Sequence, residues 1–237
     1  MEDQLVYQFL KPAVTICLIS FLAVSCSSAK HSVGGKKEDE ALRDGEVIVN
    51  IEKKAGSDTR LGKVTGVIDA PRERVWKVIS DYNEHRKFMP NLLECFAIRP
   101  EALDLVKETL PEDLAALEGR LREYKCDEPP GSIVYMYGVG DFPWPMPNKR
   151  YILRIERDLY RFRTRANMVI GEMKVNESSW ELEPYGSDAS KTLATYCVCL
   201  DPGMAIPGFA VNMAANSTLP EVIEAVRQRV KDAKYGS

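Results

Sequence analysis

The chain carries few side chains suited to histidine-based catalysis. Its 237 residues include two histidines, His31 and His85. His31 lies in a polar segment where we expect it to be solvated, and we expect His85 to be exposed on the surface of the domain. A nucleophile–histidine–carboxylate set needs a histidine held between its partners, so none is predicted. The many carboxylates show no spacing that singles out an acid–base pair, and histidine-rich metal sites are not expected.

The cysteines allow several interpretations. Cys197 and Cys199 alternate with Val198 on a predicted strand, so both thiols point to one face. Such a pair could be half of a metal site, but no second cluster completes it. The favoured interpretation is that both are small buried apolar side chains. A disulfide with Cys95 or Cys126 stays open, and no metal is predicted.

Nucleotides and nucleic acids are not expected partners. Gly138-x-Gly140 resembles part of a phosphate loop, but it lacks a third glycine, a lysine and a following helix. The net charge is −3, whereas a nucleic-acid-binding domain normally shows a basic excess. Hydrophobic residues make up 45% and charged residues 28% of the chain, which is the balance of an ordinary globular protein. The sequence therefore predicts no cofactor.

The N-terminus has the features of an export signal. Residues 12–24 form an apolar run that is shorter than the ~20 residues of a spanning helix but suits a signal-peptide core. The run ends in Leu-Ala-Val-Ser-Cys, which looks like a bacterial lipobox with Cys26 as the lipid attachment site. Ala23 and the acidic Glu2 and Asp3 depart from the usual pattern. We therefore predict that residues 1–25 are a cleaved lipoprotein signal. The alternatives are an ordinary signal peptide before a free cysteine and an uncleaved anchor.

The segment after the lipobox predicts a tether. Residues 26–44 are small, polar and charged without apolar periodicity, which is typical of a flexible linker. The mature chain would be nearly neutral, so the lipid and not electrostatic attraction would hold it on a membrane. We therefore expect an exported lipoprotein facing the periplasm. Ser27 lacks the aspartate that retains some lipoproteins at the inner membrane, which favours the outer membrane.

From Gly45 onward, the hydrophobic pattern predicts strands interrupted by a few helices. Alternation of apolar and polar residues predicts a hairpin at residues 45–53 and 61–68, followed by a helix that starts near Pro71. Residues 100–130 contain leucines at helical spacing and predict two short helices broken at Pro111, which could act as a lid. Further strands are predicted at residues 92–98, 133–139, 151–156, around 160–165, 173–182 and 192–200, with a turn at 184–190.

The last element is a helix with one apolar stripe. Leu219, Val222, Ile223, Val226 and Val230 recur at helical spacing, with Ser217 or Thr218 as the expected cap. Strands bracketed by helices predict an α+β fold with an antiparallel sheet. The stripe must pack on that sheet, and any gap left between them would be a cavity.

Three segments carry a family resemblance: Val67–Pro71 with Val75-Trp76, Asp81-Tyr82 and Phe88–Pro90; Phe142–Pro145 leading to Asn148–Tyr151; and Asp201–Gly203 with Ile206–Phe209 and Val211-Asn212. In this order they resemble START-type and polyketide cyclase/coenzyme Q-binding domains of the SRPBCC superfamily. The resemblance spans nearly all of residues 45–237, which we predict to be one domain. It departs at Tyr151, which directly follows Arg150 where the family has an aspartate.

The resemblance implies the helix-grip fold, in which a curved antiparallel sheet wraps a long C-terminal helix around an apolar tunnel. It also implies binding or transfer of a lipid or another apolar small molecule. A cyclase- or hydrolase-like enzyme acting on an apolar substrate in the same cavity is the alternative, because one fold hosts many functions. A third hypothesis is a structural envelope protein whose domain is packed solid. The lack of a histidine-based site favours a binding protein over an enzyme.

Eleven residues are candidates for the cavity lining. Trp144 could cover the tunnel mouth or fill the core, and Asn212 could bind a ligand or cap a turn. Arg150 is expected to pair with a buried carboxylate in preference to a ligand head group. The full set is Tyr135, Tyr137, Trp144, Arg150, Tyr196, Met204, Asn212, Met213, Val222, Ile223 and Val226.

Overall fold

The structure, a computed structural model, describes residues 35–54, 59–107, 114–127, 129, 131–142, 146–204, 206 and 208–236. The predicted signal peptide, Cys26, His31 and Trp144 lie outside these residues. Within these ranges, no helix combines the length and the apolar character that crossing a bilayer requires.

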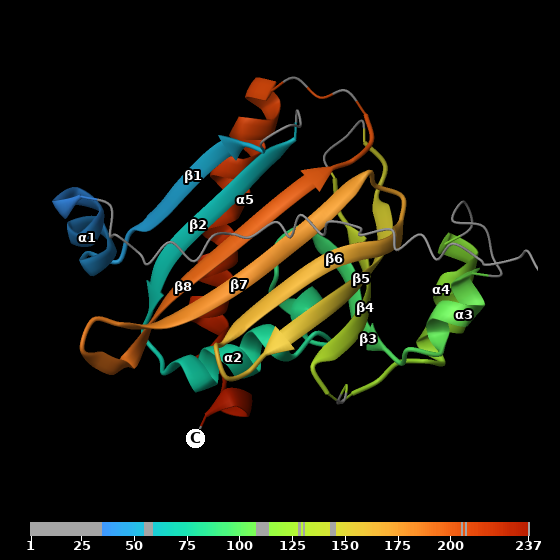
Figure 1. The fold of residues 1–237 in the computed structure, drawn as a ribbon, viewed down its shortest axis with the longest axis horizontal. Coiled ribbons are helices and arrows are strands. Elements are labelled where there is room, and N and C mark those ends of the chain that lie inside the picture. Colours follow the sequence, from blue (N-terminus) through green and yellow to red (C-terminus); the bar gives the residue numbers. More distant parts are fainter. Residues whose placement is uncertain are drawn as a thin grey trace, which may run out of the picture. The chain divides into compact units, whose positions relative to one another are not determined.

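One antiparallel sheet of eight strands forms the centre of the domain, in the order β1-β2-β8-β7-β6-β5-β4-β3 (Figure 1). Its strands are β1 Val47–Lys53, β2 Arg60–Ile68, β3 Leu92–Ile98, β4 Ile133–Gly140, β5 Lys149–Asp158, β6 Arg163–Gly171, β7 Val175–Tyr185 and β8 Asp188–Asp201. The predicted first hairpin is confirmed by the pairing of β1 with β2.

Helices cover the two faces of the sheet at different places. The helices α2 (Arg72–Ser80) and α5 (Gly208–Arg229) pack on one face, which we call the inner face. The helices α3 (Ala102–Lys107) and α4 (Leu114–Arg122) pack on the other, outer face over β3, β4 and β5 (Figure 1). The curved sheet with its long C-terminal helix confirms the predicted α+β helix-grip class.

Two glycines on β2 let α5 approach the sheet closely. A Cβ atom at Gly62 would lie 2.8 Å from a methyl group of Leu219, and one at Gly66 would lie 2.8 Å from a methyl group of Ile223. Any larger residue would therefore push the helix away from the strand. The alternating pleat places both glycines on the inner face, so the apolar stripe of α5 meets backbone instead of side chains.

The last helix begins earlier than predicted. Ser217 and Thr218 suggested a cap, yet α5 starts at Gly208 and Pro220 lies inside it. The Ser217 hydroxyl donates to the carbonyl of Ala214, as serines within helices do. Pro220 removes one backbone hydrogen bond, but the Met-Ala-Ala segment before it favours helix strongly enough to continue the element.

Two other elements differ from the prediction. Residues 36–43, predicted as part of a tether, form α1 (Lys36–Arg43), which buries Leu42. One apolar residue in a charged segment gave no periodicity to detect, although it suffices to hold this short helix on β1 and β2. The strand expected around residues 160–165 is β6, which starts later because the β5–β6 hairpin turns at residues 159–162.

Candidate functional site

The buried side chains of the inner face fall into two separate clusters. The first, the helix cluster, joins α2 and α5 to β2, β7 and β8, with Trp180 and Ile223 among its members. The second, the strand cluster, joins inner-facing residues of β3 to β6, including Tyr151 and Ala166. Two clusters on one face indicate that its middle is not filled by buried side chains.

Half-buried residues lie between the two clusters. Val198 pairs with Gly62 under α5, Ser178 pairs with Val198, and Ala166 of the strand cluster pairs with Ser178. This row therefore runs from the helix to the strand cluster through residues that are only partly covered. We call the half-buried or exposed residues Met168, Ser178, Tyr196, Val198 and Leu200 the inner strip.

The inner strip opens toward the N-terminal half of α5. Along β8, Ala194 is fully buried, Val198 is half-buried and Leu200 is 40% exposed. Along the side of α5 that faces the sheet, Leu219 and Ile223 are buried, whereas Asn212 and Ala215 are half-buried. Since Leu219 lies over Gly62, which pairs with Val198, both gradients run toward the same end of the sheet. Apolar surface is therefore uncovered on both sides of this end.

A tyrosine supplies the main polar group of the inner strip. The phenol of Tyr196 hydrogen-bonds to Ser178, and its ring lies 4.7 Å from that of Trp180. Burial raises the pKa of Tyr196 to about 12, so the phenol keeps its proton at neutral pH. It is therefore a permanent hydrogen-bond donor beside an aromatic surface.

The glycines of β4 make room for a second inward tyrosine. A Cβ atom at Gly138 would lie 2.6 Å from the ring of Tyr151, and one at Gly140 would lie 3.1 Å from the ring of Phe142. Burial also raises the pKa of Tyr151. Gly138-x-Gly140 thus serves ring packing on a strand, which accounts for a motif that had no phosphate-binding context.

The inner face is almost free of charge. At the inward positions of the described strand residues there is no carboxylate, and the cations lie at or near strand ends: Lys53, Arg60, Lys149 and Arg157. Arg157 donates from Nη2 to the carbonyl of Pro129 at 2.9 Å. Because an unpaired charge is costly to bury, this face suits an uncharged group.

Three predicted cavity residues lie on the outer face. Tyr135 and Tyr137 alternate with the inward Met136, and the hydroxyl of Tyr137 donates to Glu118 on α4 at 3.0 Å. Arg150 pairs across the sheet with Val139, and its Nη1 lies 3.9 Å from Glu172, so it pairs with a carboxylate as predicted, although a half-buried one. Period-two alternation shows which residues share a face but not which face is inner, so these three were assigned to the wrong side of the sheet.

The other candidates lie either in the buried stripe of α5 or near the start of this helix. Val222, Ile223 and Val226 are buried in the helix cluster, where they hold the helix on the sheet. Met204, Asn212 and Met213 lie at the open end, and Asn212 Oδ1 is buried without a hydrogen-bond partner among the described residues.

The histidine and cysteine positions offer packing and not reactive chemistry. His85, predicted to be exposed, is buried; its Nε2 lies 3.1 Å from the carbonyl of Ile79, and burial lowers its pKa to about 4. Cys197 and Cys199 share the outer face, as their alternation predicts, and both are buried; together with the buried Cys95 and the part-exposed Cys126, they form no disulfide with one another. Within the described ranges, no His, Cys, Asp and Glu side chains gather in a group that could hold a metal ion.

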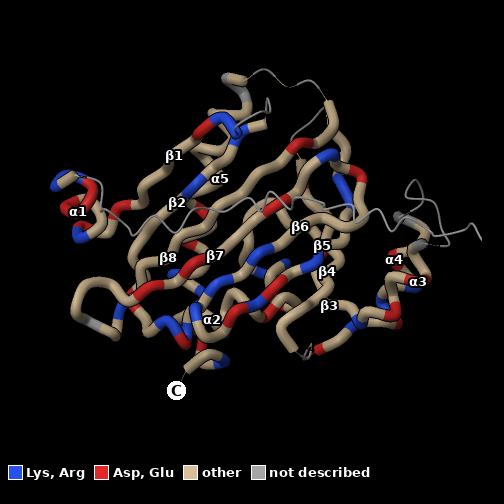
Figure 2. The backbone as a smooth tube through the Cα atoms, in the orientation of Figure 1, with Lys and Arg blue, Asp and Glu red and all other residues tan. Residues whose placement is uncertain are grey.

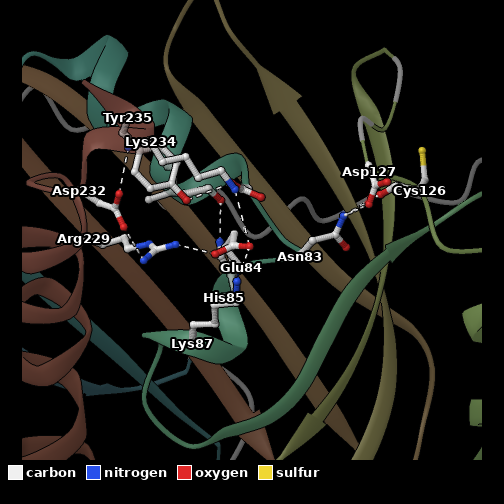
Figure 3. Close-up of polar contacts among 12 residues, drawn as sticks. Asn83, Glu84, His85, Lys87, Cys126, Asp127, Arg229, Asp232, Lys234 and Tyr235 are labelled. Atoms are coloured by element: carbon white, nitrogen blue, oxygen red, sulfur yellow. Dashed lines mark hydrogen bonds and ion pairs between the residues drawn. The ribbon is translucent and has the colours of Figure 1, made fainter. Parts of the chain in front are cut away.

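A charged cleft of about 500 Å³ lies at the far end of α5. Arg229 donates from Nη2 to Glu84 at 2.5 Å, Lys234 Nζ lies 2.6 Å from Asp81, and the Tyr235 hydroxyl donates to Asp81 at 2.9 Å (Figure 3). We call these five residues the clasp. It ties the end of α5 and the short helix η3 (Ala233–Tyr235) to the end of α2 and to η1 (His85–Lys87). Its carboxylates are neutralised by cations of the protein itself. The clasp therefore has a structural role, which is to hold these helix ends together.

Comparison with known families gives one match over most of the chain. A family described as "Polyketide cyclase / dehydrase and lipid transport" matches residues 68–227. No curated protein matched the sequence.

Several solved structures share the fold at low sequence identity. A STAR-related lipid transfer protein from Xanthomonas axonopodis (fragment 25–204) aligns with a TM-score of 0.58 at 18% identity, over 78% of this chain and 94% of that one. Human STARD10 aligns with a TM-score of 0.56 at 14% identity, over 79% of this chain and 70% of that one. The Zhui aromatase/cyclase from Streptomyces sp. R1128 aligns with a TM-score of 0.52 at 13% identity, over 76% of this chain and 99% of that one.

Proposed function

Since the chain belongs to the polyketide cyclase / dehydrase and lipid transport family, we propose that it binds an uncharged, largely apolar molecule of the lipid class against the inner strip. The ligand would lie between β6, β7 and β8 and the N-terminal half of α5. Burial of its apolar surface would drive binding at about 25 cal/mol per Å². The Tyr196–Ser178 pair would orient its one polar group.

The observation that carries this proposal is the uncovered apolar surface of a face that lacks charge. Val198 and Leu200 on β8 remain partly exposed although they lie beside a buried core. A carboxylate or phosphate group would find no cation at the centre of this face. A neutral lipid tail, or a lipid with a hydroxyl or carbonyl group, matches it.

Mass spectrometry of the gently purified full chain tests the proposal. We expect a co-purified lipid that is lost in Val198→Asp, because an aspartate there would stand unpaired against the ligand. Leu93→Asp is the matched control, since Leu93 is already exposed on the edge strand β3, and it should keep the lipid. A chain that is always empty, or a Val198→Asp chain that stays loaded, would overturn the proposal.

A second candidate function is cyclase-type chemistry in the same place. The inward phenols of Tyr151 and Tyr196 favour it, because they could hold a reactive substrate in one conformation. The described inner positions offer no base to accompany them. If a compound bound by the protein changes in mass on standing, and the change is lost in Tyr196→Phe, the enzyme is favoured.

We further propose that residues 1–25 are a signal peptide and that Cys26 carries the lipid of an outer-membrane lipoprotein. The support is the apolar run before Cys26 and the small residues at the junction. Metabolic labelling with a fatty-acid analogue should mark the wild-type chain and not Cys26→Ala. Labelling that persists in Cys26→Ala would exclude this attachment site.

A further inference from the structure

The hairpin between β5 and β6 presents apolar side chains at its tip. β5 ends at Asp158 and β6 begins at Arg163. Between them Tyr160 is 97% exposed and Leu159 is 57% exposed. The tight turn therefore exposes two neighbouring apolar side chains to water, although polar residues could occupy these positions without loss of stability.

The turn is fixed in place by a residue in an unusual conformation. Phe162 has φ +51° although it is bulky, which is a strained backbone for such a residue. Its ring is buried edge-on against Trp76 at 5.8 Å, with the guanidinium of Arg72 4.3 Å above it. The Phe162 carbonyl accepts from the amide of Leu182 at 3.0 Å, and Asp158 accepts from the amide of Arg161 at 3.0 Å. The tip is thus rigid, and its strain is maintained by packing.

The surroundings of the tip are basic. Arg157, Arg161, Arg163 and Arg165 line an open pocket of about 830 Å³ together with only two acidic residues, Glu156 and Asp158. Arg161 is paired with Asp158 and Arg163 with Glu181, so the positive surplus at this pocket comes from Arg157 and Arg165, in contrast to the net charge of −3 of the whole chain. Arg165 is exposed and has no carboxylate partner among the described residues. Basic positions, with acidic ones between them, run along β5 and β6 toward the tip (Figure 2).

We propose that the Leu159–Tyr160 tip docks on an anionic lipid surface, with its two apolar side chains among the head groups and the arginines against the lipid charge. Tyrosine is a preferred residue of the membrane interface, and each nearby arginine adds attraction to an anionic leaflet. A protein partner fits less well. The two side chains expose roughly 300 Å² on a convex turn, whereas a stable protein interface needs about 800 Å² on each partner.

This docking surface lies at the opposite end of the sheet from the opening of the inner strip. The hairpin adjoins α2 and the C-terminal half of α5, whereas the strip opens near the start of α5 (Figure 1). A domain held by the tip would keep that opening directed away from the surface it rests on. The docking itself requires no ligand and can be tested without one.

Fluorescence quenching by brominated lipids tests the proposal on the full chain. Tyr160→Trp adds a fluorophore at an exposed position, and Leu93→Trp adds one on the exposed edge strand as a control. Each is compared with the parent chain in brominated phosphatidylcholine vesicles, with and without phosphatidylglycerol. We expect at least half of the fluorescence added by Tyr160→Trp to be quenched with phosphatidylglycerol, and far less without it or at high salt.

Charge reversal isolates the electrostatic part. Arg161→Glu with Arg165→Glu, in the Tyr160→Trp chain, should abolish the preference for phosphatidylglycerol. Equal quenching in both vesicle types, or the same quenching for Leu93→Trp, would overturn the proposal. No quenching in either vesicle would also overturn it and would point to a protein partner for the tip. Since the co-purified lipid is measured separately, failure here leaves the proposed ligand binding untouched.

Discussion

The two halves of α5 lie on the same sheet but differ in what covers them. The C-terminal half, residues 219–229, rests on the glycines of β2 and ends in the clasp through Arg229. The N-terminal half, residues 208–218, lies toward the end of the sheet where Val198 and Leu200 are partly uncovered, and its Met213 is exposed. One half closes the fold, and the other lies at the end of the sheet where apolar surface is partly uncovered.

The difference follows from the residues opposite the helix. A glycine lets the helix backbone approach the strand until the side chains of the helix fill all the space. Toward the start of α5, the next inward residue of β2 is Arg60, whose guanidinium lies beside Gly208, and the neighbouring Val198 and Leu200 of β8 stay partly in contact with water. That surface is a source of binding energy for a ligand that covers it. The stabilising core and the candidate site are thus adjacent but distinct, and substitutions should separate them.

The largest effect is expected from the closed half. Ile223→Ala removes a fully buried side chain that packs on Gly66 and should lower the free energy of unfolding by about 2–5 kcal/mol. Met213→Ala, in the N-terminal half, should change the free energy of unfolding by less than about 0.5 kcal/mol, because the side chain is mostly exposed. Urea unfolding followed by circular dichroism measures both. Similar losses for the two variants would show that the halves do not differ.

Acid should destabilise the region of the clasp through His85. Its pKa is about 4 in the folded chain against 6.5 when unfolded, so the unfolded state binds more protons between these values. Stability is therefore full above pH 6.5 and falls by up to about 3 kcal/mol as the pH drops to 4. Hydrogen bonds to cations lower the pKa values of Glu84 and Glu94. Protonation of these two carboxylates therefore reduces the stability further only below pH 4.5, the usual pKa of a glutamate.

The variant His85→Gln separates the contribution of the histidine to the acid sensitivity from that of the two glutamates. Glutamine can still donate to the Ile79 carbonyl but does not titrate. Unfolding measured from pH 7 to pH 4 should then be nearly flat down to about 4.5. A wild-type chain whose stability does not change above pH 5 would contradict the burial of a neutral histidine.

The ion pairs of the clasp should contribute less than the buried core. In Glu84→Gln, Arg229 keeps only Asp232 as an anionic partner among those described, and its side chain is 17% exposed. The expected loss is about 2 kcal/mol, between the values for exposed and fully buried pairs. Glu73→Gln, which breaks an exposed pair with Arg72, is the matched control and should cost under about 0.5 kcal/mol. Thermal unfolding of both variants compares them, and equal shifts would mean that the clasp acts as an ordinary surface pair.

Much of the fold could be predicted because local patterns determine it. Alternation predicted most of the strands, although of β6 it indicated only the first residues, and the stripe from Leu219 to Val230 identified the buried half of α5. The motifs around Asp69 and Asp201 added the order in which the elements pack. Each of these signals comes from residues that are close together in the sequence, so it can be detected before the packing of distant segments is known.

The candidate site was harder to predict because it depends on partners distant in the sequence. Tyr137 and Tyr196 look alike on their strands, yet only the full register places Tyr196 on the face that carries α5 and Tyr137 on the face that carries α4. The roles of Gly62 and Gly66 appear only when Leu219 and Ile223 are packed over them. His85 follows a helix on a polar-looking segment, and its burial results from Tyr82 and Phe88 closing over it.

The smallest effect on stability should come with a clear effect on the ligand. Tyr196→Phe keeps the ring beside Trp180 and removes only the hydroxyl bonded to Ser178, so the free energy of unfolding should fall by about 1 kcal/mol or less. If that hydroxyl orients the ligand, the set of lipids found by mass spectrometry should shift toward those without a hydrogen-bonding group. Ser178→Ala should cause the same shift, and Glu84→Gln should cause none, because the clasp lies at the other end of α5. An unchanged lipid set in Tyr196→Phe would remove the phenol from the site and leave apolar contact alone to select the ligand.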